Sequence, residues 1–74
     1  MNIKTLEYIH GLLIEAETET NAYYKGARKL QHEYEESETA GKDLIKRQEA
    51  AADEYMRKHI EASNALEDFE NHEW

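Results

Sequence analysis

The sequence has no cysteine and no proline, and only three of its 74 residues are glycine. Without cysteine the fold cannot be held by disulfide bonds, and a chain this short commonly needs such a bond or a second subunit to be stable. Without proline, no residue interrupts a helix by lacking a backbone N–H donor. These absences favour long, uninterrupted helices and make self-association the expected source of additional stability.

Long apolar segments are also missing. The longest apolar run is Leu12-Leu13-Ile14, whereas a membrane-spanning helix needs about 20 apolar residues. The first residues, Met1-Asn2-Ile3-Lys4, provide neither the basic segment nor the apolar core of a secretory signal peptide. We therefore expect a cytoplasmic protein that has no membrane partner.

Positive charge is scarce. Asp and Glu number 17 against nine Lys and Arg, so the formal net charge is −8. A protein that binds DNA or RNA by neutralising phosphates needs the opposite balance, and anionic lipid surfaces repel such a chain for the same reason. The composition thus argues against direct nucleic-acid binding and favours a partner protein with a basic surface.

What is present is a heptad pattern, repeated in two stretches of the chain. Apolar or small residues recur at alternating steps of three and four, which is typical of helices packed along a seam. No stretch alternates apolar and polar residues with period two, so no strand is expected. The seam positions are Leu6, Ile9, Leu13, Ala16, Thr20, Tyr23, Ala27, Leu30 and Tyr34, followed by Ile45, Gln48, Ala52, Tyr55, His59, Ala62, Leu66 and Phe69.

The two stretches are separated by a short segment around Gly41. Gly41 can adopt the left-handed conformation that ends a helix, and Thr39 or Asp43 can cap the start of the next one. A short connection makes the helices antiparallel neighbours. We predict an all-α fold with a single domain over residues 1–74: a helix over about 3–38, a turn over about 39–42 and a helix over about 43–72. This hairpin is expected to dimerise into a four-helix bundle.

Folding the chain about Gly41 predicts which seam residues meet. Leu13 then faces Phe69, Tyr23 faces His59, and Ala27 faces Tyr55. An alternative is a three-helix arrangement with a break near Thr18–Gly26, because Thr and Asn are mediocre helix formers and Gly costs about 1 kcal/mol relative to Ala.

A polar layer is expected within the seam, formed by Thr20, Tyr23 and His59. Buried polar residues of this kind can fix the register of packed helices, as a buried Asn does in coiled coils. A sharper interpretation of the same residues is a pH switch, because a histidine changes its charge near neutral pH.

Surface beyond the seam is too apolar for a lone hairpin and predicts contacts with partners. Small or apolar residues adjoin the seam at Leu12, Leu44, Ala51 and Ala65, and two tyrosines lie off it at Tyr8 and Tyr24. The C-terminal end combines carboxylates with aromatic rings. The predicted interface residues there are Glu67, Asp68, Phe69, Glu70, Glu73 and Trp74.

Chemistry-bearing motifs are weak. Glu7-x-x-His10 resembles the helical Glu-x-x-His element of di-iron bundles, but no glutamate occupies a seam position near it. His10 and His72 reach the same level of the hairpin, yet they are an incomplete zinc ligand set. Ser37 and Ser63 lie in no nucleophile motif, and no glycine-rich loop could cradle a phosphate. We expect neither catalysis nor a metal or other cofactor.

The leading hypothesis is therefore a non-enzymatic helical interaction module, a homodimer that binds another protein through acidic and tyrosine-bearing helix faces. One alternative is a small acidic inhibitor, of the kind encoded by phages and mobile elements, that mimics nucleic acid and blocks a basic cleft. The other alternative is a metal-binding helical bundle.

Overall fold

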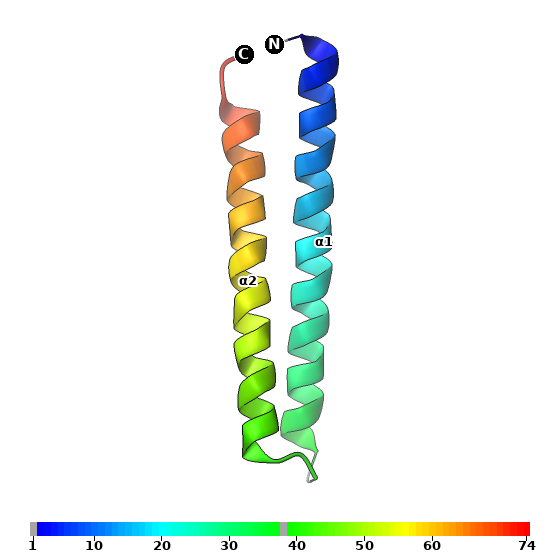
Figure 1. Ribbon diagram of the computed structural model, residues 1–74, viewed down its shortest axis with the longest axis vertical. Helices are drawn as coiled ribbons and strands as arrows, with labels where there is room; N and C mark the ends of the chain where they lie inside the picture. The colour runs from blue at the N-terminus through cyan, green and yellow to red at the C-terminus, as the bar shows by residue number, and fades with distance from the viewer. Residues whose placement is uncertain (1, 38) are drawn as a thin grey trace.

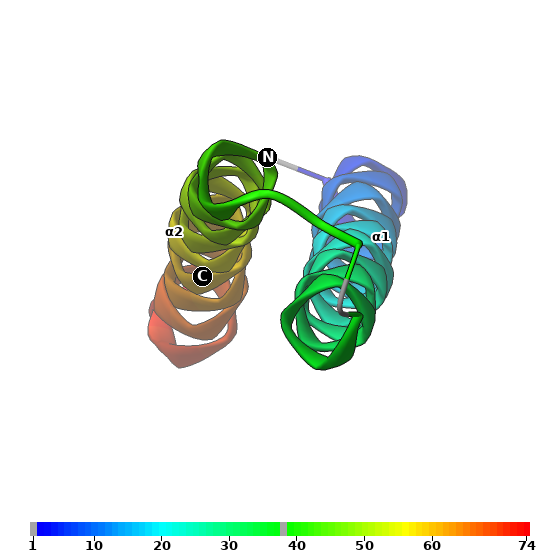
Figure 2. The same ribbon diagram turned by 90° about the horizontal axis from the view of Figure 1, so that it is seen from below.

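The protein is a two-helix hairpin. The computed structural model describes residues 2–37 and 39–74, in which α1 (Ile3–Glu36) and α2 (Lys42–Asn71) run antiparallel (Figure 1). The molecule measures 56 × 14 × 12 Å, and a view along its length shows a single layer of two helices (Figure 2). No strand occurs among the described residues. The prediction of an all-helical hairpin is confirmed, while its assembly into a four-helix bundle stays a prediction.

The helix ends differ from the predicted ones in how they are capped. The side chain of Asn2 caps α1 by accepting a hydrogen bond of 2.8 Å from the backbone N–H of Thr5. Gly41 has φ −72° and ψ 156°, so it precedes α2 as its N-cap and does not end α1 in a left-handed conformation. Asp43 lies in the first turn of α2 instead of capping it. These two capping predictions were wrong, and the predicted end of the first helix at residue 38 lies outside the described residues.

Helix α1 runs without a break through Thr18–Gly26, so the three-helix alternative is wrong. The Thr20 hydroxyl donates to the carbonyl oxygens of Ala16 (2.8 Å) and Glu17 (3.1 Å), which keeps its polar group satisfied inside the helix. Thr20 and Ala27 also pack toward α2. This tertiary packing outweighs the poor local helix propensity of the segment.

The register of the two helices is shifted by about one turn from the predicted pairing. His59 lies beside Thr20 (3.4 Å between Nδ1 and Oγ1), whereas Tyr23 stacks on Tyr55 with ring centroids 5.9 Å apart. The predicted pairing of Tyr23 with His59 is therefore wrong. The cause is the turn: because α1 ends at Glu36 and Gly41 belongs to the start of α2, the chain reverses nearer residue 39 than residue 41.

Helix α1 is also rotated about its axis relative to the prediction. Tyr23, predicted in the seam, is 61% exposed, and Leu30 is 38% exposed. The next residues along the chain, Tyr24 and Gln31, face α2 in their stead and are half-buried. The α1 residues that are buried or half-buried along this stripe are Leu6, Ile9, His10, Leu13, Glu17, Thr20, Tyr24, Ala27, Gln31 and Tyr34. Contacts from these side chains to α2, described below, explain the rotation.

The core is thin. Among the described residues only Ala27 and Ala52 are buried, at 8% and 0% exposure, and no large side chain is fully enclosed. The small side chains let the helices approach closely at this level. Elsewhere the seam consists of half-buried residues, so a single hairpin encloses little apolar surface for its length.

Candidate interaction surfaces

Charge divides the hairpin into two halves. Residues 1–20 and 59–74, here called the terminal half, carry nine carboxylates and one cation, Lys4. Residues 21–58, the turn half, carry eight carboxylates and eight cations. The whole formal charge of −8 therefore belongs to the terminal half, where the start of α1 and the end of α2 lie side by side (Figure 1).

Aromatic rings gather at the tip of the terminal half. Trp74 folds back so that its indole N–H donates to the Phe69 carbonyl oxygen at 3.1 Å. Its ring lies 4.9 Å from that of Phe69 and 4.3 Å from that of His72, between centroids. His10 of α1 also stacks with Phe69, with ring centroids 5.7 Å apart. The indole nevertheless remains accessible, because Trp74 is 61% exposed.

The rings of His10, Phe69 and Trp74, together with two carboxylates, line an open pocket of about 350 Å³ between the helices. Within it, His10 Nε2 lies 3.2 Å from the Glu70 carboxylate, a contact that links α1 to α2. Rings next to carboxylates form a surface suited to a Lys or Arg side chain, because both groups attract a cation. The lining residues are Leu6, Glu7, His10, Phe69, Glu70 and Trp74. We refer to this pocket as the tip pocket.

The tip pocket contains three of the predicted interface residues, Phe69, Glu70 and Trp74. Glu67, Asp68 and Glu73 are exposed on the same end of α2 but do not line it. Sequence reasoning did not assign Leu6, Glu7 or His10 to an interface. For His10 and Glu7 the only signal was their spacing of three, which also fits a metal ligand pair and therefore pointed elsewhere.

The predicted polar layer is present in part. Thr20 and His59 lie together in the seam, and His59 Nε2 is 3.9 Å from the Glu17 carboxylate. Tyr23 does not belong to this layer. Tyr24, predicted off the seam as a contact residue, stacks beside His59 at 6.4 Å between ring centroids. The shift of register and the rotation of α1 exchange the roles of the two tyrosines.

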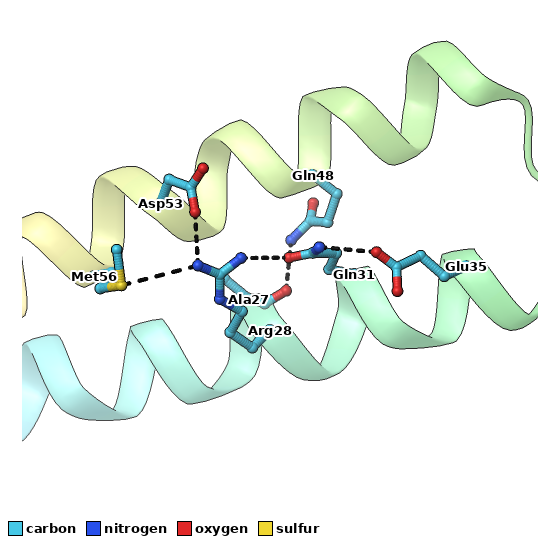
Figure 3. Close-up of polar contacts among 7 residues, drawn as sticks. All are labelled: Ala27, Arg28, Gln31, Glu35, Gln48, Asp53 and Met56. Carbon is cyan, nitrogen blue, oxygen red and sulfur yellow. Dashed lines mark hydrogen bonds and ion pairs between the residues drawn. The ribbon is translucent and has the colours of Figure 1, made fainter.

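A polar network crosses one face of the turn half, here called the network face (Figure 3). The Arg28 guanidinium donates to Asp53 of α2 at 2.6 Å and to Gln31 at 2.7 Å. Gln31 in turn donates to Glu35 at 2.9 Å. Contacts with Tyr24 and then with Asp53 raise the pKa of Arg28 above its ordinary value, so the guanidinium stays charged. Between the helices, the Gln48 side chain donates to the Ala27 carbonyl oxygen at 3.1 Å.

The other face of the turn half carries an open apolar groove of about 420 Å³. Its lining combines two exposed tyrosines and Leu30 with several small residues. The predicted interface residue Ala51 lies in this lining, which consists of Ala22, Tyr23, Gly26, Ala27, Leu30, Gln48, Ala51 and Tyr55. We call the surface that contains it the groove face.

Four other predicted interface residues are exposed. Leu12 is 47% exposed, Leu44 is 43% exposed and Tyr8 is 67% exposed, and Ala65 is exposed as well. Leu12 points in the direction of Leu30, because 18 residues make five helical turns. Leu44 lies seven residues before Ala51, which is two turns and again the same side. Leu12 and Leu44 therefore extend the groove face toward its two ends.

Other site types gain no support from the described residues. Within residues 2–37 and 39–74, no three His, Cys, Asp or Glu side chains gather closely enough to hold a metal ion. Neither α1 nor α2, over the part of the chain described, combines the length and the apolar character needed to cross a membrane.

Comparison with known proteins adds no relative. The chain matches no protein-family model, no curated protein and no solved structure.

Proposed function

We propose that this protein is a non-enzymatic interaction module, a self-associating helical hairpin that binds a partner protein with a basic surface through its terminal half. The observation that carries the proposal is the coincidence of charge and aromatic surface. The full net charge of −8 lies in the half that also holds the tip pocket, with Trp74 61% exposed at its rim. A Lys or Arg side chain would find both carboxylates and ring faces there.

The needs of the fold do not account for this charge. The C-terminal end of a helix carries a partial negative charge, which favours cations in the last turn. The last turn of α2 holds no basic residue, and residues 61–74 carry five carboxylates without a Lys or Arg. Such an end attracts a basic partner over distances up to the Debye length, about 10 Å at 0.1 M salt, and this raises the rate of association.

The only tryptophan of the chain is a built-in reporter for the test. We would titrate the protein with a synthetic arginine-rich peptide and follow the fluorescence of Trp74. Saturable binding that weakens with salt is expected. Replacing Glu67, Glu70 and Glu73 with Gln and Asp68 with Asn should slow association roughly ten-fold, because steering by charge is lost.

A matched variant separates a local site from overall charge. Glu33→Gln, Asp43→Asn, Glu49→Gln and Glu54→Gln remove four exposed carboxylates from the turn half, so the net charge changes by the same amount. This variant should bind the peptide almost as fast as the wild-type protein does. If the two quadruple variants weaken binding equally, the terminal half is not a binding site and the proposal fails.

The nine carboxylates of the terminal half support a second candidate, an inhibitor that occupies the nucleic-acid cleft of a basic protein. The two candidates differ in what they displace. An inhibitor of this kind must release duplex DNA from a basic DNA-binding protein in a competition assay, and the terminal amide variant must lose this ability. An interaction module of the first kind binds its partner without displacing nucleic acid.

A further inference from the structure

The hairpin exposes more surface than a compact protein of its mass. Its accessible surface is 5853 Å², whereas the scaling relation for compact monomers gives about 4,700 Å² at 8.7 kDa. The excess of about 1,100 Å² exceeds the roughly 800 Å² that each partner buries in a standard stable interface. The hairpin therefore exposes enough additional surface to accommodate an interface of that size.

The two faces differ in their suitability for this role. On the network face, Arg28 and Asp53 pair across the helices, and covering this charged pair would require removing its water. On the groove face, Tyr23, Leu30 and Tyr55 line a groove together with small residues, and Leu12 and Leu44 extend this face. Aromatic rings beside small residues allow the knobs of one helix pair to enter the holes of another.

We propose that a second copy of this chain binds the groove face in antiparallel orientation, so that each terminal half lies beside the turn half of its partner. This inference rests on the self-association included in the proposed function. It adds which face of the hairpin the second copy covers and how the two hairpins are oriented. The occupant is identified by area and by charge. The excess exposed surface is large enough for a dimer interface, and the charge pattern decides the orientation.

Charge favours one of the two symmetric orientations strongly. With the hairpins parallel, both terminal halves would meet, and two surfaces with a net charge of −8 each would repel. With the hairpins antiparallel, each terminal half faces a turn half that holds eight cations and no net charge. In this arrangement the twofold axis is perpendicular to the long axis of the hairpin. Each helix then packs on the same helix of the other subunit, α1 on α1 and α2 on α2. Residues 61–68 of α2 then lie at the level of Lys42, Lys46 and Arg47 of the other subunit.

The apolar part of the groove face locates the axis. It extends from the level of Leu12 to the level of Leu44, and its middle is near Tyr23 and Tyr55, which stack on each other. An axis at this level brings the tyrosines of both subunits together. It also leaves residues 3–10 and the tip pocket beyond the edge of the partner, so self-association and binding of a basic protein are compatible.

The first experiment compares two double variants of equal charge and equal exposure. Leu12→Glu with Leu44→Glu alters the groove face at residues that are 47% and 43% exposed. Ile14→Glu with Ile60→Glu alters the terminal half on the side of the network face, because Ile14 lies about four turns before Arg28 and Ile60 about two turns after Asp53. These residues are 44% and 48% exposed. Light scattering should give twice the chain mass for the wild type and the Ile variant, and the single chain mass of 8.7 kDa for the Leu variant.

The outcomes separate the inference from the proposed function. A monomeric wild type overturns both the self-association and the inference. Two results with a dimeric wild type would overturn only the assignment of the face. One is a monomeric Ile14/Ile60 variant, and the other is a Leu12/Leu44 variant that stays dimeric. Peptide binding at the tip pocket, measured on the same samples, tests the other part of the proposed function independently.

Crosslinking tests the polarity and does not depend on the Glu variants folding. Because the chain has no cysteine, single-cysteine variants give unambiguous products. Co-refolded Ala65→Cys and Leu44→Cys chains should be joined by a short bismaleimide, because antiparallel α2 helices bring these positions together. Co-refolded Ala65→Cys and Ala16→Cys chains should not be joined. The reverse result would establish the parallel arrangement and overturn the inference.

Discussion

The turn half and the terminal half of the hairpin are built differently. The turn half contains both buried residues, Ala27 and Ala52, together with the Arg28–Asp53 ion pair. Its charges balance. The terminal half has no buried residue among those described, and the net charge of the chain is located there. The contrast indicates that close packing is concentrated near the turn, and that the other half leaves its rings and carboxylates accessible.

The largest effect is expected where the helices are closest. Replacing Ala52 with Leu inserts three heavy atoms at a site with 0% exposure, which should cost about 1–3 kcal/mol of the free energy of unfolding. Ala50→Leu, two residues away at an exposed position, is the matched control and should be nearly neutral. Urea denaturation measures both. Equal effects would mean that close packing in the turn half does not hold the hairpin together.

Glycine in α1 gives the next effect. A side chain added at Gly11 meets no atom within 4 Å, so Gly11→Ala should stabilise the protein by up to about 1 kcal/mol through helix propensity alone. Thermal denaturation followed by circular dichroism measures the gain. The terminal half would gain rigidity without a new contact. No gain at all would show that this part of α1 is already frayed in the folded protein, which would sharpen the contrast with the turn half.

The Arg28–Asp53 pair should contribute less, because both side chains are partly exposed (33% and 53%). A double-mutant cycle with Arg28→Ala and Asp53→Ala should give a small favourable coupling energy, because water screens an exposed ion pair. High salt should reduce it. A coupling indistinguishable from zero would show that the network face of the turn half adds no stability beyond the packing of Ala27 and Ala52.

The smallest effect concerns the terminal carboxylates. Converting Glu67, Asp68, Glu70 and Glu73 to their amides should raise the free energy of unfolding by tenths of a kcal/mol per group at low salt, because repulsion and an unfavourable helix dipole are relieved. Added salt should stabilise the wild type more than this variant. If the variant is instead destabilised, these carboxylates hold the fold, and the division into a packed half and an accessible half is wrong.

Much of the architecture was predictable from residue spacing. Steps of three and four from Leu6 onward and from Ile45 onward predicted two long helices, and the short segment between them predicted an antiparallel hairpin. For α2 the predicted seam is also the observed one for most of its length, with Ala52 fully buried and Ile45, His59, Leu66 and Phe69 half-buried. Local periodicity suffices there because the apolar residues of α2 form a single stripe.

Periodicity did not fix how α1 meets α2. Thr20, Tyr23 and Tyr24 all lie within a turn of one another, so the pattern allowed two rotations of the helix that differ by one residue. The structure places Tyr24 beside His59 and leaves Tyr23 exposed. Contacts between residues distant in sequence, such as His10 with Glu70 and Arg28 with Asp53, accompany this choice. No local pattern records them.

The sequence by itself thus determined that this chain forms two helices, that they pair antiparallel, and that the net negative charge lies in the terminal half. Helix formation and charge distribution depend on residues near one another in the chain. Tertiary structure alone decided the register, the rotation of α1, the tip pocket and the groove face. Each of these depends on where the chain reverses and on which side chains meet across the seam. Because Gly41 begins α2 and does not end α1, the pairing moves by about one turn, and every contact between the helices moves with it.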